Sequence, residues 1–335
     1  MAKILVTGAG GYIGSIAIYQ FLQKGYEVVA VDNFSRGFKE PLDLLKEKFT
    51  ESKLRYYDYD LRNDHTPLFE KEKDIDAVVH FAAFLSVDES MKKPEEYFSN
   101  NVVGSQNLLS HLLKNNIKNI VFSSTCAVYG EADYVPVDEK HKTEPKNPYG
   151  ASKVMVENML KWYSKLKGLN YISLRYFNVC GASDDGLLGD SKKPSVHLMQ
   201  NAIRGALGIE PFYLTYSEVD TPDKSPIRDY CNVVDLNEAH ILAIDHLLAG
   251  KPSEIINLGT GDGNSVLEIV ETVKKETGKS IDVKKGEQRE GEYAKMIASI
   301  AKAKETLGWE PKRTITDSVK TLISWYKAHP QGWKA

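Results

Sequence analysis

The sequence has few of the features that mark secreted, membrane-spanning or nucleic-acid-binding proteins. It contains only three cysteines in 335 residues, Cys126, Cys180 and Cys231, and their spacing matches neither a disulfide framework nor a zinc site. No apolar run reaches 18 residues, so we expect no membrane-spanning helix. The net charge is −3 and no run of five like charges occurs, which argues against a nucleic-acid groove or an anionic-membrane surface. We therefore expect no metal site, no nucleic-acid partner and no membrane partner.

The amino-terminal residues indicate where the protein is found. The sequence MAKILVTGAG leads directly into strand-like residues and lacks a signal-peptide pattern. Together with the scattered cysteines, this predicts a reducing, cytoplasmic location. Hydrophobic residues make up 42% and charged residues 27% of the chain, values typical of globular proteins. The length suggests about two domains or one large one.

Short apolar runs alternate with longer amphipathic stretches in the first half of the chain. This alternation predicts a Rossmann-type, doubly wound parallel sheet of the α/β class, with helices on both faces. The predicted strands are 3–8, 27–33, 54–60, 76–83, 118–125 and 171–179, and the predicted helices are 11–24, 94–115 and 149–167.

The pattern loosens after Asn178, where Gly, Pro, Asp and Ser interrupt the periodicity. We expect one more strand at 254–261, a helix at 264–278 that begins with an Asn cap and stops at glycine, and a last helix at 318–330. The sequence therefore predicts an NAD-binding domain over 1–180, with a returning segment at about 230–260. A smaller mixed α/β lobe over 181–335 would bind the substrate at the carboxyl edge of the sheet.

The stretch TGAGGYIG (7–14) lies between the first predicted strand and the first predicted helix. Gly8, Gly11 and Gly14 form a G-x-x-G-x-x-G pattern. Glycines allow a tight turn and a close approach of the backbone to a pyrophosphate, and the helix N-terminus offers free N–H groups. The position between strand and helix is the context that this motif requires. It predicts a dinucleotide site.

Acidic and small residues at the next strand ends extend this prediction. Asp32 closes the second strand, where a carboxylate accepts hydrogen bonds from adenosine ribose hydroxyls and repels a 2′-phosphate, which favours NAD over NADP. Asp60 and Leu61 would lie near an adenine edge, and the small residues of 81–83 would lie under the diphosphate. A solvated strand-end carboxylate and ordinary packing are the alternatives at these positions.

Tyr149 and Lys153 in NPYGASK (147–153) lie four residues apart and so share one helix face. A phenol is a poor base at neutral pH, and lowering its pKa by about three units requires roughly 4 kcal/mol. A nearby ammonium and a positively charged nicotinamide both act in that direction. The pair therefore predicts a general base for an alcohol that loses hydride. Thr125, at the end of the fifth strand, would share the proton or hold the alcohol oxygen.

These motifs, with several later segments, resemble the extended short-chain dehydrogenase/reductase family, and within it the UDP-glucose 4-epimerases. The resemblance covers essentially the whole chain. The glycine turn and the Tyr/Lys pair are typical of the superfamily, and the later segments favour nucleotide-sugar C4 epimerases. The matching segments are VTGAGGYIGS, VDN, HFAA, SVDESMKKPEEYFSNNVVGSQNLL, SSTCAVYG, PYGASK, LRYFNVCGA, RDYCNVVDL, NLGTGDGNSV, REGE and LGW…HPQG.

The resemblance implies an isomerase that interconverts UDP-glucose and UDP-galactose through a 4-keto intermediate, with NAD as a held cofactor and a homodimeric assembly. It implies a catalytic set of Thr125, Tyr149 and Lys153. The implied substrate residues are Thr125, Tyr149, Asn178, His197, Leu198, Arg228, Arg289 and Glu292. The implied cofactor residues are Gly8, Gly11, Tyr12, Ile13, Gly14, Asp32, Asn33, Asp60, Leu61, Phe81, Ala82, Ala83, Asn100, Ser123, Tyr149, Lys153 and Tyr176.

Several positions and activities have more than one interpretation. Arg228 could be an ion-pair partner of Asp229, and Asn178 a strand-end cap. Family members carry a lysine where this chain has Leu85, and some carry a tyrosine near Met296, where a methionine would leave room for an N-acetyl group. The alternative activities are C4 epimerisation of a UDP-N-acetylhexosamine or a UDP-pentose, nucleotide-sugar dehydration, and non-catalytic dinucleotide sensing.

Overall fold

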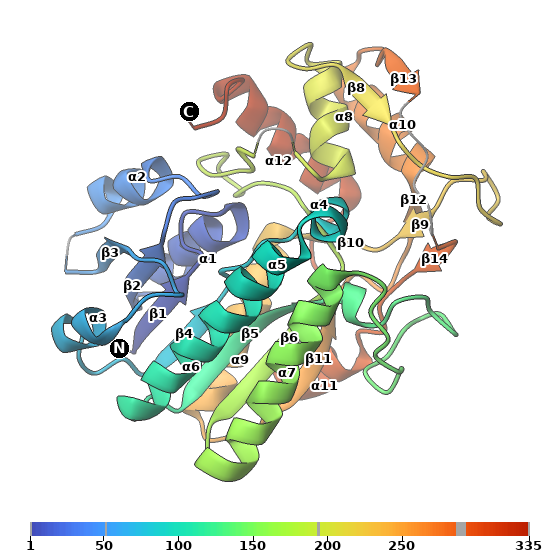
Figure 1. Cartoon of the computed structure of the whole chain (residues 1–335). Helices are drawn as coiled ribbons and strands as arrows, with labels where there is room; N and C mark the ends of the chain where they lie inside the picture. The colour runs from blue at the N-terminus through green and yellow to red at the C-terminus, as the bar shows by residue number, and fades with distance from the viewer. Residues whose placement is uncertain (1, 51, 193–194, 286–292, 334–335) are drawn as a thin grey trace. The chain divides into compact units, whose positions relative to one another are not determined.

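The computed structural model describes residues 2–50, 52–192, 195–285 and 293–333 (Figure 1). The chain forms two compact units. The first consists of Met1–Gly130, Lys142–Arg175 and Asn237–Ile256, and the second of Glu131–His141, Tyr176–Leu236 and Asn257–Ala335. Among the described residues, no helix combines the length and the apolar character needed to cross a bilayer.

Helices and strands alternate along most of the chain. They are β1 Lys3–Thr7, α1 Tyr12–Gln23, β2 Glu27–Asp32, α2 Glu40–Lys48, β3 Leu54–Asp58, α3 Thr66–Lys71, β4 Ala77–His80, α4 Val87–Lys92, α5 Pro94–Tyr97, the π-helical turn η1 Phe98–Val103, α6 Gly104–Lys114, β5 Asn119–Thr125, the 3₁₀ turn η2 Cys126–Val128, α7 Pro148–Lys167, β6 Asn170–Tyr176, β7 Asn178–Cys180, α8 Leu198–Ala206, β8 Phe212–Leu214, β9 Ile227–Arg228, β10 Tyr230–Asn232, α9 Val233–Leu248, β11 Glu254–Leu258, β12 Asn264–Ser265, α10 Val266–Thr277, β13 Val283–Lys285, β14 Lys295–Met296, α11 Ala301–Leu307 and α12 Ile315–Ala328.

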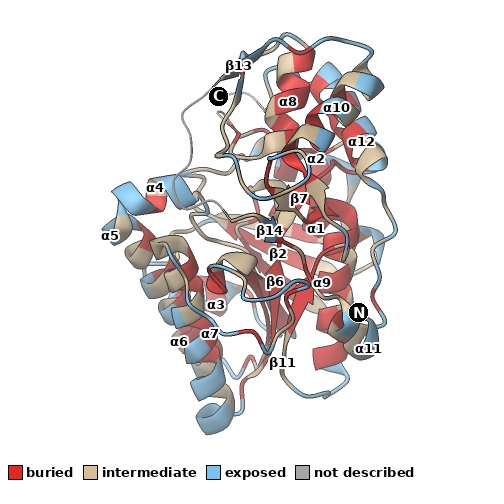
Figure 2. Cartoon of the chain, turned by 90° about the vertical axis from the view of Figure 1, so that its right-hand side faces the viewer, coloured by how far each residue is buried: buried red, intermediate tan, exposed pale blue. Residues whose placement is uncertain are grey.

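The first unit is built on a seven-stranded sheet in the order β11-β6-β5-β4-β1-β2-β3. The pairs β1–β2, β1–β4, β2–β3 and β4–β5 are parallel, so their carboxyl ends meet at one edge. Helices α6 and α7 cover one face and α9 the other (Figure 1). Strands β1, β2, β4, β5 and β6 are almost wholly buried (Figure 2), because helices on both faces leave neither face to water, whereas the edge strand β3 is mostly half-buried. The predicted Rossmann-type sheet is confirmed.

Helix α7 carries Tyr149 and Lys153, and local sequence signals fix both of its ends. The Asn147 side chain accepts a hydrogen bond from Gly150 N at 2.8 Å, and Pro148 occupies the first turn. Gly168 ends the helix with φ of 66°, the left-handed conformation that glycine adopts without strain. The apolar face of the helix places Val156 and Leu160 in the core of the unit.

The second unit has its own core, to which α8, α10 and α12 contribute, and three small sheets, β10-β7, β12-β9-β14 and β13-β8. The β9–β12 pair is antiparallel whereas β9–β14 and β8–β13 are parallel. Capping boxes begin α10 at Ser265 and α12 at Thr314. The smaller mixed α/β part that the sequence predicted is confirmed; the proposed boundary at residue 180 stays a prediction.

Several predicted elements were wrong in detail. The strand expected at 171–179 is two strands, β6 and β7, which belong to different sheets. The helix expected at 94–115 contains the π-helical turn η1. Ser265, not Asn264, caps α10, because its side chain accepts from Glu268 N while the Glu268 side chain accepts from Ser265 N. Helix α12 begins at Ile315, before the predicted start at 318.

Candidate active site

The glycine turn between β1 and α1 has the geometry of a phosphate-binding turn. Gly8 has φ of 73°, and a Cβ there would lie 2.6 Å from Ala82 N. A Cβ on Gly14 would lie 2.1 Å from Gly8 O. Side chains at either position would push the turn away from β4 or α1. The turn therefore needs glycine at both places, and it leaves bare backbone at the start of α1 that fits a diphosphate.

Asp32, at the end of β2, braces this turn. Its carboxylate accepts hydrogen bonds from Gly10 N at 2.9 Å and from Phe34 N at 2.8 Å. Burial raises the pKa of Asp32, and these backbone hydrogen bonds oppose that rise. Asn33 reaches in the same direction, since its amide donates to Asp60 at 3.0 Å. The structure thus brings Asp32, Asn33 and Asp60 together beside the turn.

A buried hydrogen-bond chain runs beneath the next strand end. Thr7 Oγ1 lies 2.6 Å from His80 Nδ1, and His80 Nε2 lies 2.8 Å from Ser105 Oγ, which donates to Asn101 O at 2.5 Å. Because Ser105 uses its proton on Asn101, His80 Nε2 must donate. Burial lowers the pKa of His80 to about 3, so the imidazole is neutral at neutral pH and Nδ1 accepts from Thr7.

This buried imidazole predicts loss of stability in mild acid. Its folded pKa of about 3 lies below the usual unfolded value of about 6.5. The unfolded state therefore takes up the proton first, and stability that is full above pH 6.5 falls as the pH drops toward 3. We expect His80→Gln to remove about 2 kcal/mol of the stability difference between pH 7.5 and pH 5, measured by urea unfolding. An equal pH dependence in the variant and the parent would contradict a neutral, buried His80.

Tyr149, Lys153 and Thr125 meet at the carboxyl end of β5. Lys153 Nζ donates to Ser123 O at 2.7 Å and lies 6.0 Å from the centre of the Tyr149 ring. Thr125 ends β5, where its Oγ1 accepts from Ala127 N at 3.2 Å, and its side chain also hydrogen bonds with Tyr149. The three residues that the sequence singled out thus lie together in the first unit.

The protonation of this pair differs from the sequence prediction. Burial raises the pKa of Tyr149 to about 12, although the hydrogen bond with Thr125 acts to lower it. Burial also lowers the pKa of Lys153 to about 7, against the attraction of Glu157. In the protein alone, burial therefore dominates the pKa of both groups. The lowering of the phenol pKa expected with the oxidised cofactor bound stays a prediction.

Glu157 lies one further turn along α7 and is fully buried with Arg175 of β6. Arg175 donates to the Glu157 carboxylate at 2.9 and 2.6 Å, and Ser124 Oγ and Ser173 Oγ donate at 2.7 and 3.1 Å. Ser124 lies between Ser123 and Thr125, so this network ties α7 to the strand end that faces Tyr149. The sequence motifs did not point to either ionised residue, although Glu157 continues the spacing of Tyr149 and Lys153.

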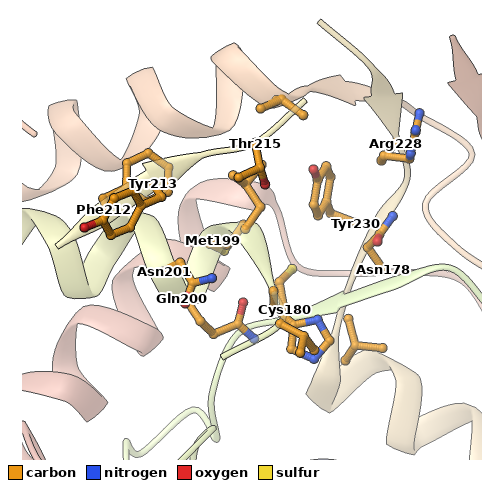
Figure 3. Close-up of a pocket in the computed structure, with 15 residues that line it drawn as sticks. Asn178, Cys180, Met199, Gln200, Asn201, Phe212, Tyr213, Thr215, Arg228 and Tyr230 are labelled. Atoms are coloured by element: carbon orange, nitrogen blue, oxygen red, sulfur yellow. The ribbon is translucent and has the colours of Figure 1, made fainter. Parts of the chain in front are cut away.

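The second unit contains a cavity of about 120 Å³. Figure 3 shows Asn178, Tyr230 and Arg228 from β7, β10 and β9 on one side, and Phe212 and Tyr213 of β8 on the other. The cavity is lined by Asn178, Val179, Cys180, Val196, His197, Leu198, Met199, Gln200, Asn201, Phe212, Tyr213, Thr215, Arg228, Tyr230 and Val266.

The cavity is suited to a polar ligand. Arg228 contributes a guanidinium, one nitrogen of which donates to Ile227 O at 2.9 Å and to Tyr293 O at 2.8 Å. Gln200 is fully buried, and neither its side-chain oxygen nor its nitrogen has a hydrogen-bond partner among the described residues. Such groups call for a ligand or water. The sequence motifs did not point to Gln200, Tyr213 or Tyr230.

Half of the residues predicted to bind substrate lie at this cavity. Asn178, His197, Leu198 and Arg228 line it, and burial lowers the pKa of His197. The alternative for Arg228, an ion pair with Asp229, stays open. The Asp229 carboxylate accepts hydrogen bonds from Thr260, Gly261 and Ala298. Arg289 and Glu292 lie outside the described residues.

The remaining residues predicted to bind cofactor lie mostly around the glycine turn and the ends of β3 to β5. Phe81, Ala82 and Ala83 follow β4 directly, and Asn100 lies in η1, where its amide donates to Asn101 at 3.0 Å. Tyr12 and Ile13 begin α1, and Leu61 packs against the core of the first unit. Tyr176 ends β6 and belongs to the second unit.

Comparison with known proteins assigns the chain to a family. The model of the NAD dependent epimerase/dehydratase family matches residues 4–259. A UDP-glucose 4-epimerase of Lactobacillus helveticus is 39% identical over 336 residues, spanning 99% of each chain. A UDP-glucose 4-epimerase of Streptococcus mutans is 39% identical over 338 residues, spanning 98% of each chain.

Solved structures agree with this assignment. A UDP-glucose 4-epimerase from Bifidobacterium longum in complex with NAD⁺ and UDP has a TM-score of 0.93 and 35% identity, covering 99% of this chain and 100% of that one. The enzyme from Stenotrophomonas maltophila, with bound NAD and formylated UDP-arabinopyranose, has a TM-score of 0.93 and 33% identity, covering 99% of each. The predicted resemblance is confirmed, and the chain belongs to the NAD dependent epimerase/dehydratase family.

Proposed function

We propose that the protein interconverts UDP-glucose and UDP-galactose by C4 epimerisation through a 4-keto intermediate, with NAD as a bound cofactor. The single observation that carries the proposal is the meeting of Tyr149, Lys153 and Thr125 at the end of β5, in a chain similar over its full length to UDP-glucose 4-epimerases. This cluster has one base, one cation and one hydroxyl, the groups that oxidation of a secondary alcohol requires.

The first unit has the residues to hold NAD. The bare glycine turn at the start of α1 fits the diphosphate, and Asp32 offers carboxylate oxygens for the ribose hydroxyls. The same carboxylate disfavours a 2′-phosphate, so we assign NAD rather than NADP. When bound, NAD supplies an acceptor and donor for the hydride of the sugar C4.

The chain itself supplies the proton chemistry. Tyr149 takes the proton of the sugar 4-hydroxyl as C4 becomes a ketone, and it returns the proton when the 4-keto sugar is reduced on its opposite face. Thr125 holds the sugar oxygen and shares the proton. Lys153 is fixed by Ser123 O, one helical turn from Tyr149. Because burial alone raises the phenol pKa, we assign part of the lowering that catalysis needs to the positive charge of the oxidised nicotinamide.

We assign the uridine diphosphate to the cavity of the second unit. The Arg228 guanidinium suits a phosphate because its planar fork donates two parallel hydrogen bonds. Asn178 and Gln200 offer amides for the remaining polar groups, and Tyr213 offers an exposed ring at the cavity wall. The cavity therefore provides a cation, amides and an aromatic ring, which a nucleoside diphosphate needs. Arg289 and Glu292 stay predictions.

Incubation of UDP-galactose with the purified protein tests the proposal. We expect UDP-glucose to form without added cofactor, because NAD should stay bound through purification. Proton NMR of the anomeric signals measures the product. UDP-N-acetylglucosamine and a UDP-pentose, incubated in parallel, measure the breadth of the site. UDP-galactose that is unchanged after long incubation with NAD⁺ supplied would contradict the proposal.

The alternative activities are not favoured. A dehydratase needs an acid–base pair after the catalytic threonine, and this chain has Cys126 and Ala127 there. A non-catalytic dinucleotide sensor would not need Thr125, Tyr149 and Lys153 together. Met296 is buried in β14, where it pairs with Arg228 of β9. The parallel incubations test whether Met296 helps to select the sugar.

We further propose that the protein acts in the cytoplasm as a homodimer. Analytical sedimentation would measure the oligomeric state.

A further inference from the structure

Two segments contact opposite ends of the glycine turn in the first unit. On one side, Phe38 N donates to Gly10 O at 2.9 Å, so the segment 34–38 lies against the turn. Ala82 N would lie 2.6 Å from a Cβ on Gly8, so the chain that follows β4 also lies against the turn. Both segments therefore contact the turn whose bare backbone fits the diphosphate.

Side chains join these two segments directly. Arg36 donates to the Glu89 carboxylate at 2.6 and 2.9 Å, a two-pronged ion pair, and its guanidinium carbon lies 3.6 Å from the centre of the Phe84 ring. Tyr97 donates to Glu89 at 2.9 Å. We call Arg36, Phe84, Glu89 and Tyr97 the clasp. Its bridging pair is 53 residues apart in sequence, and no sequence motif pointed to either member.

The Glu89 side of the clasp is firmly anchored. Asn101 is buried and binds both backbone groups of Phe84, accepting from its N at 2.8 Å and donating to its O at 3.0 Å. Asn101 also donates to Ser152 of α7 at 3.1 Å. Tyr97 is fully buried, and its ring contacts Phe84 edge-on at 5.7 Å. Glu89 lies in the first turn of α4, where the helix dipole favours a carboxylate.

The segment that carries Arg36 has attachments besides the clasp. Phe38 N donates to Gly10 O, a Cβ on Gly37 would lie 2.8 Å from Gly10 C, and the Phe34 ring contacts Tyr56 edge-on at 6.2 Å. Arg36 and Glu89 are each about 30% exposed, so water and salt reach the pair. The ion pair is therefore a partly exposed, salt-sensitive link between the two segments.

We propose that the clasp closes a ring around the dinucleotide and sets the rate at which it leaves. The ring runs from Gly10 through Phe38 and Arg36 to Glu89, and back through Phe84 and Ala82 to Gly8. NAD held at the glycine turn would then be enclosed by this ring, and its release would require Arg36 to part from Glu89. The proposal rests on the assignment of NAD under "Proposed function" and adds retention residues to it.

Leu85, which follows Phe84 of the clasp, has no charge and is 38% exposed. The clasp holds the cofactor by closure, since the Arg36 charge is neutralised by Glu89. Retention should then depend on the Arg36–Glu89 bond and not on net positive charge near the diphosphate.

The test measures release of NADH from the full-length protein. Protein loaded with NADH is mixed with excess NAD⁺, and the loss of NADH fluorescence gives the dissociation rate. We expect Glu89→Gln and Arg36→Met each to speed release about tenfold or more, and the charge-swapped pair Arg36→Glu with Glu89→Arg to recover part of the loss. Raising the salt from about 0.05 to 0.5 M should speed release from the parent but not from Arg36→Met.

A matched control separates the clasp from general surface charge. Lys39 lies on the same stretch and forms an exposed ion pair with Asp58 at 3.1 Å, so Lys39→Met removes a neighbouring cation without touching the clasp. Its release rate should stay within about twofold of the parent. Clasp variants that keep their circular dichroism and release NADH at the parent rate would overturn the proposal. A parent protein that binds no NADH would overturn the cofactor assignment and the clasp together.

Discussion

Replacing Tyr149 with phenylalanine is expected to lower kcat for UDP-galactose by about 10²- to 10⁴-fold, the usual contribution of a positioned general base. The phenol hydroxyl is the group that takes the substrate proton in the proposed reaction, and phenylalanine keeps the ring that packs beside Lys153. Folding and NADH binding should therefore change little, and the loss should fall on kcat more than on KM. The measurement is steady-state epimerisation, with circular dichroism and NADH titration alongside.

A second phenol on the same helix provides the control. Tyr163 lies in α7 and packs against the core of the first unit, so Tyr163→Phe removes a hydroxyl from the helix without touching the reaction. Its kcat should stay within about twofold of the parent. If Tyr149→Phe retained a third or more of the parental rate, Tyr149 would not be the base.

Replacing Glu157 with methionine is expected to lower the free energy of unfolding by about 3–5 kcal/mol, because it leaves Arg175 as an uncompensated buried cation. Both side chains are almost wholly inaccessible, with Arg175 3% and Glu157 2% exposed. Ser124 and Ser173 would also lose their acceptor. Urea unfolding at pH 7.5 measures the change.

The double variant tests the cause. Glu157→Met with Arg175→Met removes both charges and should be more stable than either single variant, because no buried charge is left unpaired. If the losses of unfolding free energy in the two single variants simply added up in the double variant, the account would be contradicted. A loss below about 1 kcal/mol in Glu157→Met would show that the ion pair does not hold α7 to β5 and β6.

Local signals explain what the sequence could predict. The glycine turn and α7 depend on features within a few residues of each other: glycines at fixed spacing, the Asn147 cap, Pro148, and Gly168 at the C-terminus. The apolar runs that became β1, β2, β4 and β5 are buried on both faces, so they are readable without knowing their partners. The Tyr149–Lys153 spacing belongs to the same class of local signal.

Long-range contacts explain the features that the sequence could not predict. The 171–179 run divides because Phe177 N donates to Leu258 O while Asn178 pairs with Tyr230 in another sheet. Asn264 and Ser265 are both good caps, and the structure selects Ser265, which forms a capping box with Glu268. Helix α9 mixes apolar residues with Asp235, Asn237 and Glu238 at its start, and its helical period was not recognised. The Arg36–Glu89 pair joins residues that no local pattern connects.

The phenol pKa shows a different limit. Residue types alone place a cation near Tyr149, but they do not say that both groups are buried. Burial raises the pKa of the phenol and lowers that of the Lys153 amine, the reverse of the effect inferred from charge alone. The sequence shows which residues can carry a charge, whereas burial in the fold shifts the pKa that decides whether they do.

The most direct test of the central claim follows a deuterium atom at C4 of UDP-galactose. If Tyr149 removes only the hydroxyl proton while the C4 hydrogen leaves and returns as hydride within the protein, the UDP-glucose formed should keep the deuterium at C4. NMR and mass spectrometry of the product in ordinary water measure this. Product that has lost its deuterium to solvent would contradict the account, because C4 would then exchange its hydrogen as a proton.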